Sequence, residues 1–129
     1  MEKPALILWG GTDISPRYYQ QLPGKHTQHA NHKRDAREFA QATKAIYEGQ
    51  AIVGICRGAQ LLCVLNGGSL YQHSEPTKQD HPIVCLTAKP PYIEKTYYNV
   101  SASHHQIMRP EGNYQVLGWN PEETLVYEQ

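Results

Sequence analysis

Two short apolar runs, each followed by a glycine-containing turn, constrain the fold of this chain more than any other feature. Residues 5–9 (ALILW) and 51–55 (AIVGI) are continuous and apolar, which is typical of strands buried on both faces of a parallel sheet. A helical spacing of apolar residues follows over 35–48, and 58–65 is a second, almost wholly apolar helix. This alternation of strand and helix predicts an α/β fold with a parallel sheet.

The remaining patterns are less regular. Residues 15–33 contain Pro16, Pro23 and Gly24 and predict a long surface connection. Asp35, followed three residues later by Glu38, predicts a capping box, so we expect 34–38 to cap and anchor the first helix. Further short strands are predicted over 69–72, 82–87, 96–100, 115–118 and 125–127.

Length and charge limit the classes of protein and partner. The 129 residues predict a single domain over 1–129. Lys and Arg total 12 and Asp and Glu total 12, so no net positive field exists to attract a nucleic acid or an anionic membrane. Three cysteines without a Cys-x-x-Cys pair, and no leader segment before them, predict a cytoplasmic protein. We expect a small-molecule partner and leave a homo-oligomer open.

A Gly-x-Cys-x-Gly motif, residues 54–58 (GICRG), lies where the second strand meets the second helix. This is the cysteine form of the nucleophile elbow, in which small flanking residues permit a sharp turn that projects the thiol from the strand end. The positive end of the helix dipole favours a thiolate at Cys56. The amide of Arg57 and an amide from the Gly10-Gly11 turn are expected to form an oxyanion hole.

Packing is the alternative role for Cys56, because cysteine is among the most buried residue types. We assign Cys63, in the apolar helix, and Cys85, in an apolar strand-like run, to packing. Histidines recur every third residue within 26–32 and could bind a metal, but no cysteine or carboxylate accompanies them, which favours a polar surface loop. We expect no metal and no organic cofactor.

Four segments of the chain resemble a known family. They are 9–16 (WGGTDISP), 34–38 (RDxxE), 54–60 (GICRGAQ) continuing to 66–72 (NGGSLYQ), and 103–106 (SHHQ). In this order they resemble the class I glutamine amidotransferase-like superfamily and, within it, the γ-glutamyl hydrolase-like branch of the peptidase C26 type. The resemblance implies a flavodoxin-like sheet, parallel with a mixed edge and flanked by helices.

The resemblance also implies roles for individual residues. Cys56 would attack a γ-glutamyl carbonyl and form a thioester, followed by hydrolysis or ammonia transfer. The amides of Gly11 and Arg57 would hold the oxyanion, and Gln60 would sit beside the substrate. The pocket for the glutamyl end would be lined by Ser103, His104 and His105.

One departure from the family concerns the general base. Family members complete a Cys-His-Glu triad with a late His-Pro-Glu segment, which these 129 residues do not contain. A general base contributes roughly 10²- to 10⁴-fold to the rate. Three explanations follow in order: the chain is a fragment or processed form, His104 or His105 substitutes, or the protein is a catalytically weak binding module. Residues 103–106 argue against another cysteine-elbow protein of the deglycase-like or chaperone-like kind.

Overall fold

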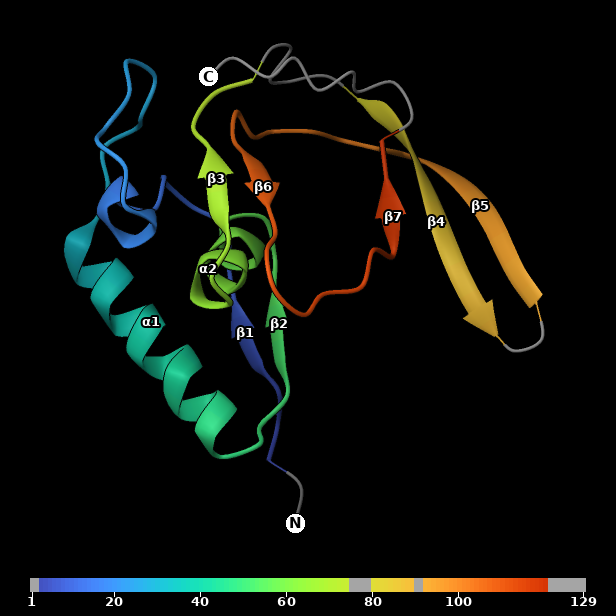
Figure 1. Ribbon diagram of the computed structural model, residues 1–129, viewed down its shortest axis with the longest axis horizontal. Helices are drawn as coiled ribbons and strands as arrows, with labels where there is room; N and C mark the ends of the chain where they lie inside the picture. Colours follow the sequence, from blue (N-terminus) through green and yellow to red (C-terminus); the bar gives the residue numbers. More distant parts are fainter. Residues whose placement is uncertain (1–2, 75–79, 90–91, 121–129) are drawn as a thin grey trace. The chain divides into compact units, whose positions relative to one another are not determined.

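The computed structural model describes residues 3–74, 80–89 and 92–120 (Figure 1). Contacts divide the described chain into two compact units. The first unit contains residues 3–74 and 105–113, and the second contains 80–89, 92–104 and 114–120. The chain has the mixed α/β character that the sequence predicts, whereas a single domain over 1–129 stays a prediction.

The first unit is built on two paired strands and two helices. Its elements, in chain order, are β1 (Leu6–Leu8), the 3₁₀ helix η1 (Pro16–Tyr19), α1 (His32–Tyr47), β2 (Ile52–Gly54), α2 (Arg57–Leu65), β3 (Ser69–Tyr71) and β6 (Ile107–Arg109). Strands β1 and β2 pair in parallel, and β3 pairs antiparallel with β6. The predicted strand, helix, strand and helix of the first half are therefore present.

Both helices pack against one face of the β1–β2 pair. The main buried cluster consists of Leu8, Ile14, Ala42 and Leu61. Leu8 comes from β1, Ala42 from α1 and Leu61 from α2, so one apolar cluster joins all three elements. Burial of this apolar surface fixes where β1 and the turn after it lie relative to α2.

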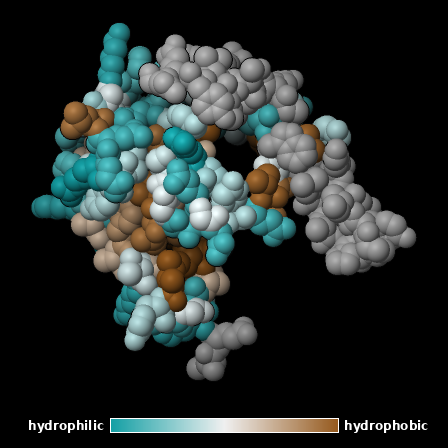
Figure 2. Space-filling view, in the orientation of Figure 1, coloured by the Kyte–Doolittle hydropathy of each residue, from teal (hydrophilic) through white to brown (hydrophobic). Residues whose placement is uncertain are grey.

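The opposite face of β1 and β2 is exposed, so the prediction of strands buried on both faces is wrong. Ile7 is 44% exposed and its partner across the pair, Val53, is 48% exposed. Side chains alternate between the faces of a strand, and the helices cover only the face that carries Leu8. Figure 2 shows hydrophobic residues on the surface where β1 and β2 lie.

Helix α1 begins earlier than predicted, and the predicted capping box is wrong. Asn31 is the N-cap, and its side chain accepts a hydrogen bond of 3.0 Å from the backbone N–H of Arg34. Asp35 and Glu38 therefore lie inside the helix, and both are buried. Because Asn31 caps the helix, the side chains of Asp35 and Glu38 are not needed as caps and face the core.

The long connection over 15–33 also differs from its prediction at its first residues. Ser15, Pro16 and Tyr19 are buried, and η1 packs beside α1 through the stacked rings of Tyr18 and Phe39, whose centroids are 4.3 Å apart. The start of this segment belongs to the core, because Tyr19 packs with Val64 of α2 and Leu70 of β3.

The second unit is an antiparallel sheet with the strand order β5-β4-β7. Its strands are β4 (His81–Lys89), β5 (Tyr92–Val100) and β7 (Gly118–Trp119). The strands predicted over 82–87 and 96–100 are present and longer, and the one predicted over 115–118 is shifted towards Trp119. The prediction over 125–127 lies outside the described residues. Across the residues described, no helix has both the length and the apolar character required to cross a bilayer.

Candidate functional site

Cys56 lies at the junction between β2 and α2, where it is the N-cap residue of the helix. Its backbone has φ 54° and ψ −111°, and its side chain is exposed. Positive φ is uncommon for a residue other than glycine. This conformation turns the chain directly from the strand into the helix, which leaves the thiol accessible at the end of β2.

The two glycines that flank Cys56 are required by close backbone packing. A Cβ at Gly54 would lie 2.6 Å from the carbonyl carbon and oxygen of Gly58. A Cβ at Gly58 would lie 2.1 Å from the carbonyl oxygen of Leu8 in β1. Both distances are far below van der Waals contact, so any side chain at either position would separate the helix from the strand.

The direction of the Arg57 amide follows from the first hydrogen bond of α2. The carbonyl oxygen of Cys56 accepts a hydrogen bond of 3.1 Å from the N–H of Gln60. In a trans peptide the C=O and the N–H point in opposite directions, so the Arg57 N–H points away from the body of the helix. It therefore lies on the N-terminal side of α2, where helices favour negative charge.

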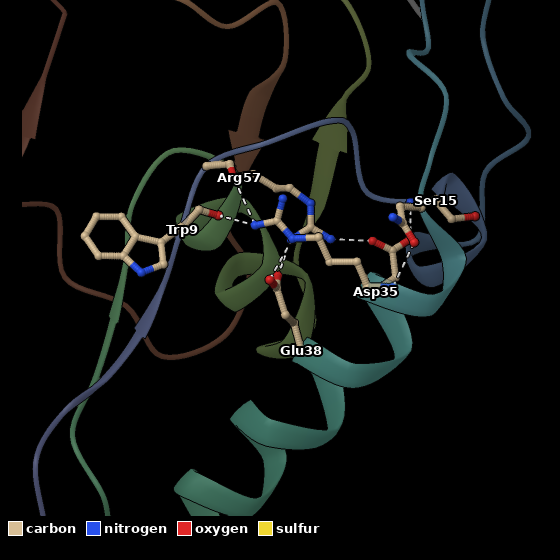
Figure 3. Close-up of polar contacts among 8 residues, drawn as sticks. Trp9, Ser15, Asp35, Glu38 and Arg57 are labelled. Atoms are coloured by element: carbon tan, nitrogen blue, oxygen red, sulfur yellow. Dashed lines mark hydrogen bonds and ion pairs between the residues drawn. The ribbon is translucent and has the colours of Figure 1, made fainter.

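The side chain of Arg57 is buried and pairs with two carboxylates of α1. Its guanidinium donates to Asp35 and to Glu38, and only 1% of the Arg57 side chain is exposed (Figure 3). The second oxygen of Asp35 accepts a hydrogen bond of 3.0 Å from the backbone N–H of Ser15. The residue that follows Cys56 is thus tied to α1 and, through α1, to the segment that follows β1.

A second arginine ties the same helix to the turn after β1. Arg34 donates from Nε to Glu38 over 2.7 Å, and from Nη2 to the carbonyl oxygens of Trp9 over 3.1 Å and Gly10 over 2.9 Å. Burial raises the pKa of the Glu38 carboxyl, but hydrogen bonds and charge from Arg34 and Arg57 outweigh it, so the pKa is lowered overall. Glu38 is therefore held as a carboxylate between two guanidinium groups.

His105 pairs with Asp13, an acidic residue that was not predicted as part of the site. Its Nε2 lies 3.0 Å from each carboxylate oxygen of Asp13, and its Nδ1 lies 3.4 Å from Nδ1 of His73. His73 stacks on the ring of His26, with centroids 3.8 Å apart. Both ring nitrogens of His105 therefore have neighbours other than Cys56, which speaks against His105 as the substitute base.

Residues beside this pair are also buried. Gln106 is buried next to Tyr19, whose pKa is raised to about 12 by burial, partly opposed by the neighbouring Gln106 side chain. The pairing of Asp13 with His105 and the burial of Gln106 hold the segment after β1 against the segment before β6.

The structure divides the predicted recognition residues between its two units. Ser103 and His104 belong to the second unit and His105 to the first. Gln60 is buried on α2, one turn after Cys56. Their joint contact with a substrate stays a prediction.

Cys63 and Cys85 were predicted to have packing roles, and no metal site was expected. Cys63 is half-buried, and burial raises the pKa of its thiol. Cys85 lies in β4. Within the described part of the chain, no three His, Cys, Asp or Glu side chains are arranged to hold a metal ion.

Comparisons with known proteins identify the family to which this chain belongs. The family model described as Peptidase C26 matches residues 4–125. A Mycobacterium tuberculosis protein provisionally named a glutamine amidotransferase is 46% identical over 69 residues, covering 54% of this chain and 22% of that protein. Protein NtpR of Enterococcus hirae is 46% identical over 67 residues, covering 52% of this chain and 28% of that protein.

A longer match has lower identity. The glutamine amidotransferase-like protein YvdE homolog of Lactococcus lactis is 30% identical over 122 residues, covering 83% of this chain and 64% of that protein. This chain thus spans less than two thirds of the length of each of these relatives. The family match extends from before β1 to beyond β7 and includes the junction that carries Cys56. The chain belongs to the peptidase C26 family.

Proposed function

We propose that this protein is a cysteine-dependent hydrolase or amidotransferase-like protein that acts on a γ-glutamyl amide through a thioester at Cys56. The observation that carries the proposal is the positive φ of an exposed cysteine at the junction of β2 and α2. Unusual backbone conformations of this kind cluster at active sites. The family membership and the names of the relatives support a hydrolase or amidotransferase-like chemistry.

The proposed reaction uses the nucleophile elbow in two steps. The Cys56 thiolate attacks the side-chain carbonyl carbon, and the N–H groups of Gly11 and Arg57 donate to the oxygen that becomes negative. Collapse of this intermediate forms the thioester and expels ammonia or an amine, which takes up a proton. Water then cleaves the thioester, releases the γ-carboxylate and restores the thiol.

The general base of this reaction is the open part of the proposal. His105 is engaged by Asp13 and His73, and His104 is the other histidine that the family resemblance offers as a substitute base. We propose that Gln60, Ser103, His104 and His105 contact the glutamyl end of the substrate. A proton acceptor at this point contributes roughly 10²- to 10⁴-fold, so its identity decides whether turnover is fast or slow.

The proposal also covers the sheet that carries Cys56, the location of the protein and its partners. Parallel pairing of β1 with β2, with the cysteine at their carboxyl edge, fits a flavodoxin-like sheet, in which ligands bind at that edge. We propose a cytoplasmic protein with a small-molecule γ-glutamyl substrate and without nucleic-acid or membrane partners. The reaction as written uses neither a metal nor an organic cofactor, and self-association is compatible with it.

The proposal is tested by intact-mass labelling with a glutamine-like diazoketone. The reagent loses N₂ on alkylation and leaves a ketone attached through sulfur, so one adduct per chain is expected. Cys56→Ser should abolish the adduct, whereas Cys63→Ser should retain it because Cys63 is half-buried and its pKa is raised. Labelling that persists in Cys56→Ser would remove Cys56 as the nucleophile.

The second candidate function is a binding or interaction module of the same fold with weak or no catalysis. The engagement of His105 by Asp13 and His73, and not by Cys56, favours it. It predicts that the chain binds a γ-glutamyl compound in a calorimetric titration but releases no chromophore from γ-glutamyl-p-nitroanilide. Release that is lost in Cys56→Ser would decide for the enzyme.

A further inference from the structure

We propose that Arg34 is a positioning residue that sets the direction of the Gly11 amide in the oxyanion hole. The inference rests on the proposed function, because it assigns a task to an amide that only a thiol nucleophile at Cys56 would use. The sequence assigns Arg34 only to a segment that caps and anchors the first helix and that resembles the family. Its role comes from the contacts that α1 makes with the turn after β1.

The first step of the argument is the geometry of one peptide unit. The carbonyl oxygen of Gly10 and the N–H of Gly11 belong to the same planar trans peptide and point in opposite directions. Nη2 of Arg34 donates to that oxygen over 2.9 Å. Holding the oxygen towards α1 therefore forces the Gly11 N–H towards the other side of the turn.

The second step is that glycine needs this support at position 11. Without a Cβ, the chain can rotate around Gly11 more freely than at other residues. The guanidinium lies against this Cα so closely that a Cβ on Gly11 would be 2.0 Å from Nη1 of Arg34. Arg34 therefore limits the rotation of the backbone at Gly11, where the missing side chain allows the most rotation.

The third step connects this turn to the nucleophile. Glu38 accepts from Arg34 with one carboxylate oxygen and from Arg57 with the other. Arg57 is the residue after Cys56, and its own amide is the second proposed donor. One buried carboxylate thus ties the side chain that orients the Gly11 amide to the side chain of the residue that carries the second donor.

The guanidinium is suited to this task because its donors form a rigid planar fork. Arg34 uses Nε for the carboxylate and Nη2 for two backbone oxygens, and 23% of its side chain is exposed. A lysine at this position carries the charge on a single ammonium and cannot reproduce the fork. Arg34→Lys should therefore preserve the fold better than it preserves the direction of the Gly11 amide.

The experiment compares two alkylating reagents on Arg34→Gln, Arg34→Lys and the control Arg37→Gln. Arg37 is exposed on the same helix and has no part in the site. The ketone oxygen of the bound diazoketone would occupy the oxyanion hole while Cys56 is alkylated, whereas iodoacetamide requires only an accessible thiolate. For Arg34→Gln we expect the diazoketone rate at Cys56 to fall roughly 100-fold, since a displacement of about 1 Å costs about 10²-fold and loss of one donor about 10²- to 10³-fold. The iodoacetamide rate should change less than about twofold.

Each outcome decides the matter. An unchanged diazoketone rate in Arg34→Gln, or an equal loss of rate with both reagents, overturns the positioning role. If Arg34→Gln does not fold, Arg34→Lys replaces it, with about tenfold slower diazoketone labelling expected and a normal rate again overturning the role. If the unaltered chain itself fails to label, the proposed function fails and the inference falls with it, which is distinct from failure in the variants alone.

Discussion

Gly58→Ala tests whether close contact between α2 and β1 holds the Cys56 junction together. The added Cβ would be 2.1 Å from the carbonyl oxygen of Leu8 and 2.8 Å from its Cβ, so the helix must move by roughly 1 Å. That movement would break the 2.9 Å hydrogen bond from the Ile55 N–H to the same oxygen. Overpacking costs about 1–3 kcal/mol and the lost bond about 0.5–1.5 kcal/mol. Alanine has a helix propensity more favourable than glycine by up to about 1 kcal/mol, which leaves a net loss of about 0.5–4.5 kcal/mol.

This loss is measurable against a total stability of about 5–15 kcal/mol. Urea unfolding followed by far-UV circular dichroism should show a lower midpoint for Gly58→Ala with a similar slope. Gly10→Ala is the matched control, because a Cβ there would only contact the Cβ of Cys56 at 3.6 Å. Equal free energies of unfolding for Gly58→Ala and the unaltered chain would refute the reasoning.

Three further predictions concern buried polar groups. Asp35→Ala should lower the free energy of unfolding by about 3–5 kcal/mol in a urea titration, because it leaves the buried Arg57 with one carboxylate; a loss below about 1 kcal/mol would contradict this. Although burial opposes it, the two neighbouring arginines lower the pKa of Glu38 below its ordinary 4.5, so this group stabilises the fold above that pH and the contribution is lost as the pH falls. Glu38→Gln should then show a smaller loss of stability on acidification than the unaltered chain, and parallel curves would count against the assignment. Burial raises the pKa of Tyr19 from 10.0 to about 12, so stability should fall between those pH values, and Tyr19→Phe should flatten that part of the curve; an identical fall in both proteins would exclude Tyr19 as its source.

The first half of the fold could be predicted from the sequence because its signals are local. The apolar runs over 5–9 and 51–55 and the helical pattern between them identify β1, β2 and α1 within a few residues. The start of α1 was misplaced because Asn31 and Asp35 are both good caps, and only packing shows that Asp35 faces the core. Strand β6 was missed, since three residues after a polar segment give no periodic pattern.

The candidate site divides in the same way. The Gly-x-Cys-x-Gly motif identified Cys56 as a candidate. Recognising the motif required only the predicted strand before Cys56 and the predicted helix after it. The contact between Asp13 and His105 joins residues 92 positions apart, and the one between Arg57 and Asp35 joins residues 22 apart. No local pattern reports such pairs, because the partner is chosen by the packing of other elements.

The backbone conformation of Cys56 sets the stability of the fold against the proposed catalytic role of this residue. A non-glycine residue in a sparsely populated conformation costs of order 1–3 kcal/mol, which glycine would largely avoid. Cys56→Gly should therefore raise the free energy of unfolding, and a chain that gains nothing from this change would contradict this expectation. Selection for heat resistance alone would favour glycine here, at the expense of the thiol that the proposed reaction uses.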